Sequence, residues 1–371
     1  MKYWAVVLIS FASLNAFAFR DKALGTSPRG LLMGNAYTAL ADDEYTLFYN
    51  PAVLARHSGF SFYPINPQVR SVNVLNEPDR FTDLGDDPND FADAAFDYPI
   101  HIGLDYSPTF KMGYFGFTGL YQNNTNLNLQ NQVNPSLEVD HRFDTGFIAG
   151  FGIPLQGSFS SKSGGSHLAI GASLKYIKRE SVYGSYDLTG YTLLDALSSS
   201  EIEDILDSLG KVNGQGWGFD LGLDYATSNG GSTFMVGLAL LDVVTNIQTE
   251  DNVNDLEVQD QPMQVHLGSA WKGSVGGGFN VTVSADIKNL SEQMEFARRL
   301  HLGAEVSLSP ALAIYAGVNA VDNYSYGLKF NAGLVKAFAG IYGEEVGENL
   351  GQQDADRFLV YLSLFDFTFE P

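Results

Sequence analysis

Long runs of alternating apolar and polar residues are the feature that most restricts the fold of this chain. Residues 216–225 place Trp217, Phe219 and Leu221 on one face, and Gly218, Asp220 and other small or acidic residues on the other. The same period of two recurs in 100–106, 279–288 and 300–308, and it is the period of a β-strand. The longer runs reach about 10 residues, which suits a tilted membrane strand better than the about 5 to 6 residues common in soluble proteins. We therefore predict an all-β fold, a transmembrane antiparallel β-barrel, in preference to a soluble β-sandwich.

The N-terminus predicts export. Lys2 precedes an apolar run over residues 3–11, and Ala16-Phe17-Ala18 has the small-x-small form of a cleavage site. The run is shorter than the about 20 residues of a spanning helix, so we expect a signal peptide at 1–18, with an uncleaved anchor as the alternative. No later stretch is apolar for long enough to span a membrane as a helix.

Composition narrows the possible partners. The chain has 21 Lys and Arg against 43 Asp and Glu, a formal net charge of −22, and it has no cysteine. Nucleic acid is not expected as a partner, because phosphate binding needs clustered cations. Disulfides and thiolate metal sites are excluded. The 39 glycines, 19 tyrosines and 26 phenylalanines suit a barrel with tight turns and aromatic girdles.

The connections between the alternating runs predict the number of strands. They are long at 74–98, 122–138, 180–215, 247–262, 289–297 and 345–356, and short at 107–109, 155–165, 228–231, 272–278, 309–310 and 335–337; the connection at 321–323 is short where a long one is expected. Bacterial barrels have short periplasmic turns and longer external loops. We therefore predict fourteen strands between about Gly59 and Phe369, with both ends of the barrel on the periplasmic side of the outer membrane of a Gram-negative-type bacterium.

Two further segments have recognisable patterns. The last strand, Phe358 to Phe369, resembles the aromatic-rich terminal signal that barrel-assembly machinery reads, although Glu370 and Pro371 follow it. The partners of the protein would then include the barrel-assembly machinery and outer-membrane lipid. The 180–215 connection predicts one short extracellular helix, either a packed cover over the barrel mouth or lipid interface, or a gate for an apolar ligand. Its pattern consists of Ile202, Ile205, Leu206 and Leu209 at helical spacing, Ser200 and Glu203 as a capping box, and Gly210 as a cap.

One motif carries a family resemblance. Residues 34–55, GNAYTALADDEYTLFYNPAVLA, resemble the N-terminal signature of the FadL-type transporters of hydrophobic compounds and of the PorV-like and TraF-like outer-membrane proteins. The family usually continues with glycine where this chain has Val53, and residues 216–225 also resemble a strand of the PorV/TraF-like group. The matching residues are Gly34, Ala36, Asp42, Asp43, Asn50, Pro51 and Ala52.

The residues of this motif predict a small-residue helix, an Asn-Pro turn and the start of a strand. A residue that precedes proline avoids helical geometry, so Asn50 should end the helix. Asp42 and Asp43 could pair with Lys or Arg in the lumen. The resemblance implies that residues 19–57 form a plug inside a barrel of residues 58–371, and that the signature residues hold or gate this plug. The alternative is that the signature residues have only a structural role, in which they hold the plug in place and contact no ligand.

Polar residues on the inner face of the predicted strands are the remaining candidates for a site. His101, His266 and His301 could form a proton-linked or metal site with Asp105 or Glu305, or could be scattered lumen residues. The acidic stretch Asp83, Asp86, Asp87, Asn89 and Asp90 hints at a calcium loop but lacks the spacing of an EF-hand, and we predict neither a metal nor a cofactor. The full set of expected lumen residues is His101, Asp105, Asp220, Asp224, His266, Asp286, Lys288, His301 and Glu305.

Two functions remain open from the sequence. The chain contains no GxSxG, HExxH or P-loop motif, so we do not expect an enzyme. One possibility is a plugged channel for uptake or export of small hydrophobic compounds. The other is a structural or secretion-accessory barrel that binds another protein through its loops or plug. A continuous apolar pocket between plug and wall would favour transport.

Overall fold

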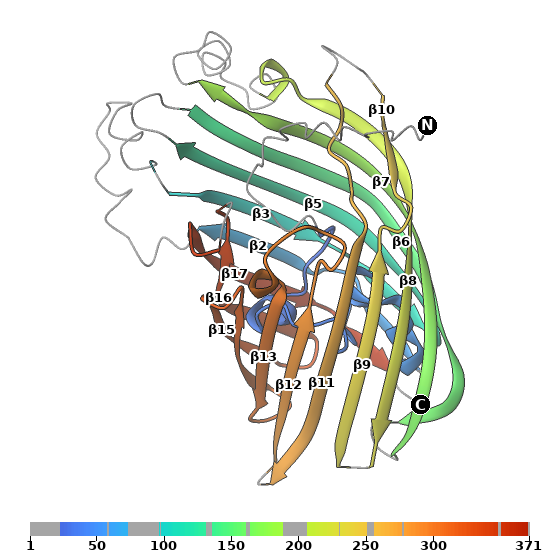
Figure 1. Cartoon of the computed structure of the whole chain (residues 1–371). Helices are drawn as coiled ribbons and strands as arrows, with labels where there is room; N and C mark the ends of the chain where they lie inside the picture. The colour runs from blue at the N-terminus through green and yellow to red at the C-terminus, as the bar shows by residue number, and fades with distance from the viewer. Residues whose placement is uncertain are drawn as a thin grey trace, which may run out of the picture.

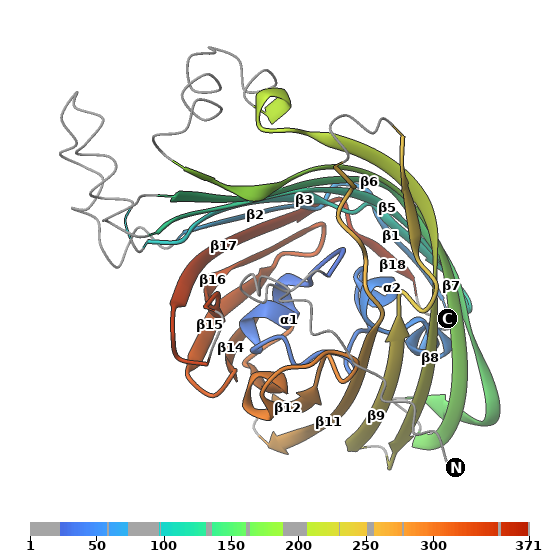
Figure 2. The same cartoon turned by 45° about the horizontal axis from the view of Figure 1, so that its top comes forward.

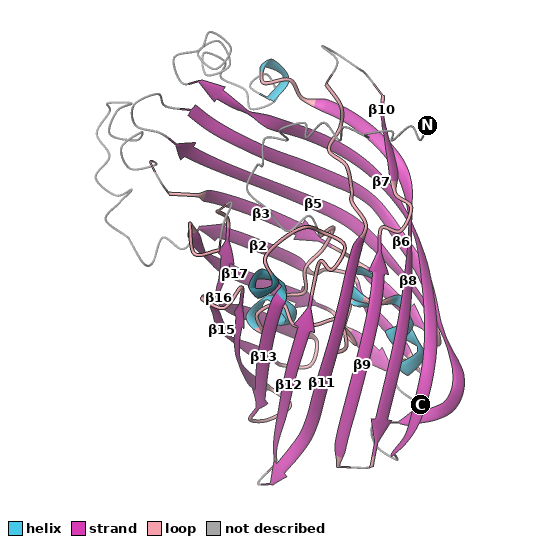
Figure 3. Cartoon of the chain, in the orientation of Figure 1, coloured by secondary structure: helices cyan, strands magenta, loops and turns pink. Residues whose placement is uncertain are grey.

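The computed structural model describes residues 23–57, 59–72, 96, 98–130, 136–160, 164–187, 206–229, 231–250, 256–276, 278–347 and 350–369. The signal peptide predicted at 1–18 and the acidic stretch at 83–90 lie outside these residues. Within them, strands form almost all of the regular structure (Figure 3). None of the helices in the described part of the chain is both long and apolar enough to cross a membrane.

The strands form one antiparallel barrel (Figure 1). Eighteen hydrogen-bonded segments make fourteen wall strands, because four of the strands each consist of two consecutive segments. The wall strands are β1 (Phe60–Tyr63) with β2 (Pro67–Val72), β3 (Ile100–Tyr106) with β4 (Thr109–Met112), β5 (Phe115–Gln130), β6 (Ser136–Ser160), β7 (Gly164–Asp187), β8 (Val212–Ser228), β9 (Ser232–Leu241) with β10 (Asn246–Thr249), β11 (Gln264–Gly276), β12 (Phe279–Ile287), β13 (Leu300–Ser307), β14 (Leu312–Asn319), β15 (Asn323–Asn331), β16 (Val335–Glu345), and β17 (Asp354–Leu364) with β18 (Phe367–Phe369). The predicted fourteen-stranded barrel is confirmed.

The barrel closes by pairing the first wall strand with the last. Val69 of β2 lies opposite Val360 of β17, and Ser61 of β1 lies opposite Thr368 of β18. The two pairings share one register, so the closure is a continuous ladder. A closed ladder satisfies the backbone groups of every wall strand, which is the requirement for crossing lipid with strands.

Three predicted boundaries are wrong. Residues 107–109 do not form a turn: β3 and β4 pair with β5 in one register, and the chain turns at Gly113, which has φ +56°. Pro108 lacks an N–H and interrupts the segment without ending the strand. The 122–138 connection is much shorter than predicted, because β5 continues to Gln130 and β6 starts at Ser136. The tight turn placed at 335–337 instead precedes β16 and contains Gly333, with φ +83°.

The two faces of the wall differ as alternation requires. Trp217 is 52% exposed on the outer face, and Asp220 and Asp224 of the same strand are fully buried on the lumen side. Other outward residues share this exposure of apolar surface. They include Phe219, Leu221, Leu223, Tyr225, Phe279, Val283 and Leu302. The exterior is therefore an apolar surface suited to lipid.

A charge placed on this outer surface should destabilise the barrel. We expect Val283→Arg to lower the heat stability of the folded barrel, because a lipid-facing Arg near the midplane costs about 2–4 kcal/mol. The measurement is the temperature at which the fast-migrating folded band disappears in gel electrophoresis. Asn319→Arg is the control, since it puts the same charge into the lumen cavity described below. Equal melting of both variants would contradict the assignment of faces.

The N-terminal residues lie inside the ring of strands (Figure 2). They form α1 (Pro28–Leu32), α2 (Thr46–Tyr49) and the 3-10 helix η1 (Pro51–Arg56), and nearly all of their side chains are buried. We call residues 23–57 the plug. No residue of the plug belongs to a strand, so the plug occupies the lumen without taking part in the wall.

The structure describes only the C-terminal end of the helix predicted in the 180–215 connection, and that end is helical. Residues 206–208 are helical, and Gly210 follows with φ +86°, as its predicted role as a cap requires. Leu206 and Leu209 pack against Val139 near the start of β6 and Val182 near the end of β7. The residues of the proposed capping box lie outside the described part of the chain. A short 3-10 helix, η3 (Phe296–Arg299), precedes β13.

Candidate functional site

Local sequence explains the short helices of the plug. Ser27 caps α1 by accepting a hydrogen bond from the N–H of Gly30 at 3.2 Å, and Pro28 occupies the first turn. Asn50 ends α2 in an extended conformation, and its side chain accepts a hydrogen bond from Ala52 N at 3.1 Å. Asn50 therefore ends the helix as its position before proline predicts.

The predicted small-residue helix is wrong. Residues 34–41 form turns between α1 and α2 rather than a helix, and Gly34 and Asn35 both have positive φ, which no right-handed helix contains. The small residues serve close packing instead: Ala36, Ala39 and Ala41 are almost fully buried. Sequence pattern alone did not distinguish these two uses of small residues.

Glycines of the wall let the plug backbone touch the strands. A Cβ added at Gly171 of β7 would lie 2.3 Å from Ala52 N, and one added at Gly317 of β14 would lie 2.1 Å from Gly34 N. These distances are shorter than any van der Waals contact. The signature turn and the start of the motif therefore sit where wall strands have no side chain.

The two segments that resemble family motifs touch each other. Asn50 Nδ2 donates to the carbonyl of Leu223 in β8 at 3.0 Å, and a Cβ at Gly222 would lie 2.1 Å from Asn50 Oδ1. Asp224, two residues along the same strand, accepts a hydrogen bond from Arg56 Nε at 2.8 Å and contacts His167 at 2.9 Å. The Asn50 turn and strand β8 are thus two halves of one docking contact.

Buried ion pairs fix the plug on other sides of the lumen. Arg29 pairs with Glu305 of β13 at 2.7 Å. Glu44 accepts hydrogen bonds from Lys336 Nζ of β16 at 2.8 and 3.0 Å, and from the Tyr361 hydroxyl of β17. Removing one member of a buried pair costs about 3–5 kcal/mol, because it leaves the other charge without its partner. The contacts therefore hold the plug tightly.

Wall side chains also bind the backbone of the plug. Asp286 of β12 accepts hydrogen bonds from the N–H groups of Tyr37 and Thr38, both at 2.8 Å. Lys111 of β4 donates to the carbonyls of Asp42 and Asp43 at 2.7 and 2.9 Å. These contacts grip the turns that replace the predicted helix.

The acidic pair Asp42 and Asp43 interacts mostly within the plug. Asp42 pairs with Arg29 at 3.0 Å, and its side chain is 54% exposed. Burial raises the pKa of Asp43, as does neighbouring Glu44. Asp43 accepts hydrogen bonds from Ser27 and Tyr37 at 2.9 and 2.7 Å. Their direct wall contact is through backbone carbonyls rather than carboxylates.

The other expected lumen residues fall into three groups. Glu305, Asp224 and Asp286 bind the plug as described, and His301 Nδ1 lies 2.7 Å from the carbonyl oxygen of Gly34. Asp105 and Asp220 pair with wall cations, Arg70 at 2.8 Å and Lys175 at 2.7 Å. His101, His266, Lys288 and His301 line one cavity.

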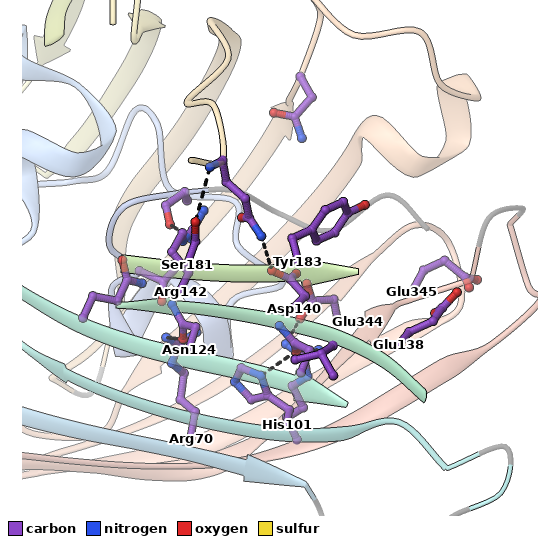
Figure 4. A pocket seen from close by; sticks show the side chains of 18 of the residues that line it. Arg70, His101, Asn124, Glu138, Asp140, Arg142, Ser181, Tyr183, Glu344 and Glu345 are labelled. Atoms are coloured by element: carbon purple, nitrogen blue, oxygen red, sulfur yellow. Dashed lines mark hydrogen bonds and ion pairs between the residues drawn. The ribbon is translucent and has the colours of Figure 1, made fainter. Parts of the chain in front are cut away.

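This cavity has a volume of about 820 Å³ (Figure 4). It lies toward the barrel end that bears the long connections, and plug residues Ala23, Thr26, Leu31 and Asn35 form part of its lining. Most of the other lining residues are polar or charged, but apolar atoms contribute the larger share of the lining surface. The three histidines share this cavity, but the described residues contain no group of three His, Asp or Glu arranged to hold a metal ion.

Below the cavity the plug packs closely on the wall. A void lined by plug residues Phe48 and Tyr49 and wall residues Leu241 and Gln264 holds only about 10 Å³. The ladder of the wall is closed around this level. Beside Phe48 and Tyr49 the plug therefore leaves no room for a small molecule against the wall.

Sequence reasoning missed the cations and the tyrosine that anchor the plug. These residues are Arg29, Arg56, Lys111, Lys336 and Tyr361. A usable signal existed: cations are scarce in this acidic chain, and Lys111 and Lys336 occupy strand segments. Their partners lie up to 317 residues away in sequence, so pairing could not be read from spacing.

Comparison with known proteins finds similar solved structures but no match by sequence. No family model and no curated protein matches the sequence. The chain is similar to the CymD monoaromatic hydrocarbon channel, with 12% identity, a TM-score of 0.49, and coverage of 94% of this chain and 99% of that one. It is also similar to the Pseudomonas putida toluene transporter TodX, with 12% identity, a TM-score of 0.45, and coverage of 94% and 98%. CdiB from Escherichia coli follows at 10% identity and a TM-score of 0.36, over 81% of this chain and 63% of that one.

Proposed function

We propose that this chain is a plugged channel of the outer membrane of a Gram-negative-type bacterium, through which small hydrophobic compounds pass when the plug moves. The observation that carries the proposal is the way the plug is attached. Side-chain and backbone contacts hold it, and none of its residues joins a strand. It can therefore move without opening the hydrogen-bond ladder of the wall.

The resemblance of residues 34–55 to the FadL-type signature supports the substrate class. The apolar exterior supports a location in lipid, and we propose that the long connections face outside and that barrel-assembly machinery inserts the chain. The cavity then faces the exterior and receives the compound first. Its volume of about 820 Å³ is within the usual range of small-molecule sites, about 300–1,000 Å³.

The alternative is an accessory barrel that binds another protein. It is favoured by one observation: the space between plug and wall described above is closely packed rather than a continuous apolar passage. In that case the plug would be a permanent filling, and the loops or plug would carry the interaction.

Uptake by cells with an intact outer membrane separates these functions. We expect cells that make the chain to take up radiolabelled toluene several-fold faster than cells that carry the empty vector, because lipopolysaccharide otherwise slows hydrophobic compounds. The control is the same chain with its plug tied to the wall by a zero-length carbodiimide cross-link between Glu44 and Lys336. Glu44→Gln, treated in the same way, cannot form this cross-link and shows the effect of the reagent alone. Uptake equal to the vector for the uncrosslinked chain, at equal amounts of folded barrel, would contradict the channel.

A further inference from the structure

A short segment without regular secondary structure lies on the lumen side of the wall. It consists of residues 256–263, which precede β11 and which we call the strap. Val258 of the strap is 5% exposed, and a Cβ added at Gly214 of β8 would lie 2.8 Å from its Cγ1. The other side of the strap lines the cavity, through Leu256, Glu257, Gln259 and Asp260. The strap therefore lies between the cavity and the inner face of the wall.

Side chains of several strands hold the strap in place. The Gln259 N–H donates to Ser181 Oγ of β7 at 3.4 Å, and Gln259 Nε2 donates to Asp140 Oδ1 of β6 at 3.0 Å. Figure 4 shows Asp140 and Ser181 on this wall. Gln261 Nε2 donates to Asp242, which follows β9, at 3.1 Å. These bonds tie one irregular segment to the ends of three wall strands.

Arg179 of β7 makes most of the attachment, and its side chain is fully buried. Its Nη1 donates to the carbonyls of Gln259 and Asp260 at 2.9 and 3.3 Å. Its Nη2 donates to Gln261 Oε1 at 2.7 Å. Its Nε and Nη2 also donate to the two carboxylate oxygens of Asp144, at 2.6 and 3.0 Å. A guanidinium has five N–H donors, so the strap takes three of them and Asp144 takes the other two.

Asp144 links Arg179 to the start of the plug. Asp144 of β6 is fully buried and lies directly opposite Arg179 in the pairing of β6 with β7. Its Oδ2 also contacts Nε of Arg142, two residues away on β6, at 3.2 Å. Nη2 of Arg142 donates to the carbonyl of Ala23, the first described residue of the plug, at 3.2 Å. One carboxylate is therefore shared by the arginine that holds the strap and the arginine that holds the plug.

This sharing couples the two segments. If the strap left the wall, three donors of a buried guanidinium would lack partners, which is costly for a charged group. The guanidinium of Arg179 would turn toward water in the cavity, and Asp144 would move with it because Arg179 binds both of its oxygens. Arg142 would then lose its carboxylate partner, and with it the orientation in which it reaches Ala23.

We propose that the strap is a latch on the plug: its release from the wall frees the start of the plug, through Asp144. Strap residues and Ala23 line the same cavity, so a compound that displaces the strap would loosen the plug from the cavity side. The inference deepens the proposed function and rests on it for what then passes through the barrel. The coupling itself does not depend on transport.

Single cysteines can report on the two segments, because the unaltered chain contains none. Val258→Cys reports on the strap and Leu24→Cys on the start of the plug, and each replaces a side chain that is 5% exposed. We expect a maleimide to label both slowly in the full chain, folded in detergent. Gln261→Leu removes one bond between Arg179 and the strap. It should speed labelling at both reporters by about tenfold, the value of a hydrogen bond to a charged group.

Asp144→Asn tests the link between the segments. We expect it to speed labelling of both reporters. Once Asp144 is replaced, Gln261→Leu should bring no further increase at Leu24→Cys, because the path between them is already broken. Asp105→Asn is the matched control, since Asp105 is also a buried carboxylate that pairs with a wall arginine, Arg70, at 2.8 Å. It should leave both reporters protected.

The possible results are distinct. Faster labelling of Val258→Cys without a change at Leu24→Cys, on addition of Gln261→Leu, would overturn the latch. So would protection of both reporters in Asp144→Asn. If Asp144→Asn gives no folded barrel, the result with Gln261→Leu decides alone.

A third reporter distinguishes local release from general loosening. Val53→Cys replaces a side chain of η1 that is 2% exposed, and we expect it to stay protected in each variant. Labelling of Val53→Cys as fast as that of Leu24→Cys would overturn a link specific to the start of the plug. Coupled labelling of strap and plug start, in a chain that fails to accelerate toluene uptake, would support the latch and contradict the channel.

Discussion

Deleting residues 19–57 should convert a nearly silent barrel into one that conducts steadily. The wall strands lie between Phe60 and Phe369 and form their own closed ladder, so we expect the shortened chain to assemble. The plug fills the lumen below the cavity, and its removal leaves an aqueous path lined by the side chains that now anchor it. Conductance in a planar bilayer measures this change.

The control for this experiment is the intact chain purified in the same way, with both proteins shown to be folded by heat-modifiable migration. Porin-like conductance by the intact chain would contradict a closed plug. Loss of the folded barrel on deletion would show that the plug takes part in assembly of the wall. The second result has a physical basis, since the buried core contains both plug and wall residues.

Gly171→Val should release the plug without breaking the wall. A Cβ at this position would lie 2.3 Å from Ala52 N and 2.4 Å from the carbonyl carbon of Pro51, and backbone atoms cannot yield as a flexible side chain can. Overpacking costs about 1–3 kcal/mol or more, while valine itself suits a strand. We expect intermittent channel openings.

Trypsin gives a second measurement of the same release. The side chains of Arg29 and Arg56 are only 14% and 8% exposed in the docked plug, so the enzyme should cut there in Gly171→Val and not at these sites in the unaltered chain. Gly231→Val is the matched control, because an added Cβ there meets nothing within 4 Å. Protection of both arginines in Gly171→Val would show that the plug accommodates the added side chain.

Parts of the site were predictable because they depend on strand parity. Alternation in 216–225 placed Asp220 and Asp224 on the face opposite Trp217, and the structure has them in the lumen. The Asn50-Pro51 turn followed from the restriction that proline imposes on the preceding residue. The helix expected around Ala36 did not form, because small residues favour both helices and close packing, and a period cannot tell these apart.

The sequence by itself determined the barrel, its fourteen strands and the direction of most wall side chains. It also predicts an export signal. Each of these depends on local order: the period of two and the lengths of connections. Only the tertiary structure decided which partners the lumen side chains have, why glycines such as Gly171 and Gly317 stand where they do, and which residues share the cavity. The physical reason is that closure of the sheet brings together strands from the two ends of the chain, such as β1 and β18. The closed sheet then surrounds a plug, and no local pattern specifies contacts such as that of Glu44 with Lys336.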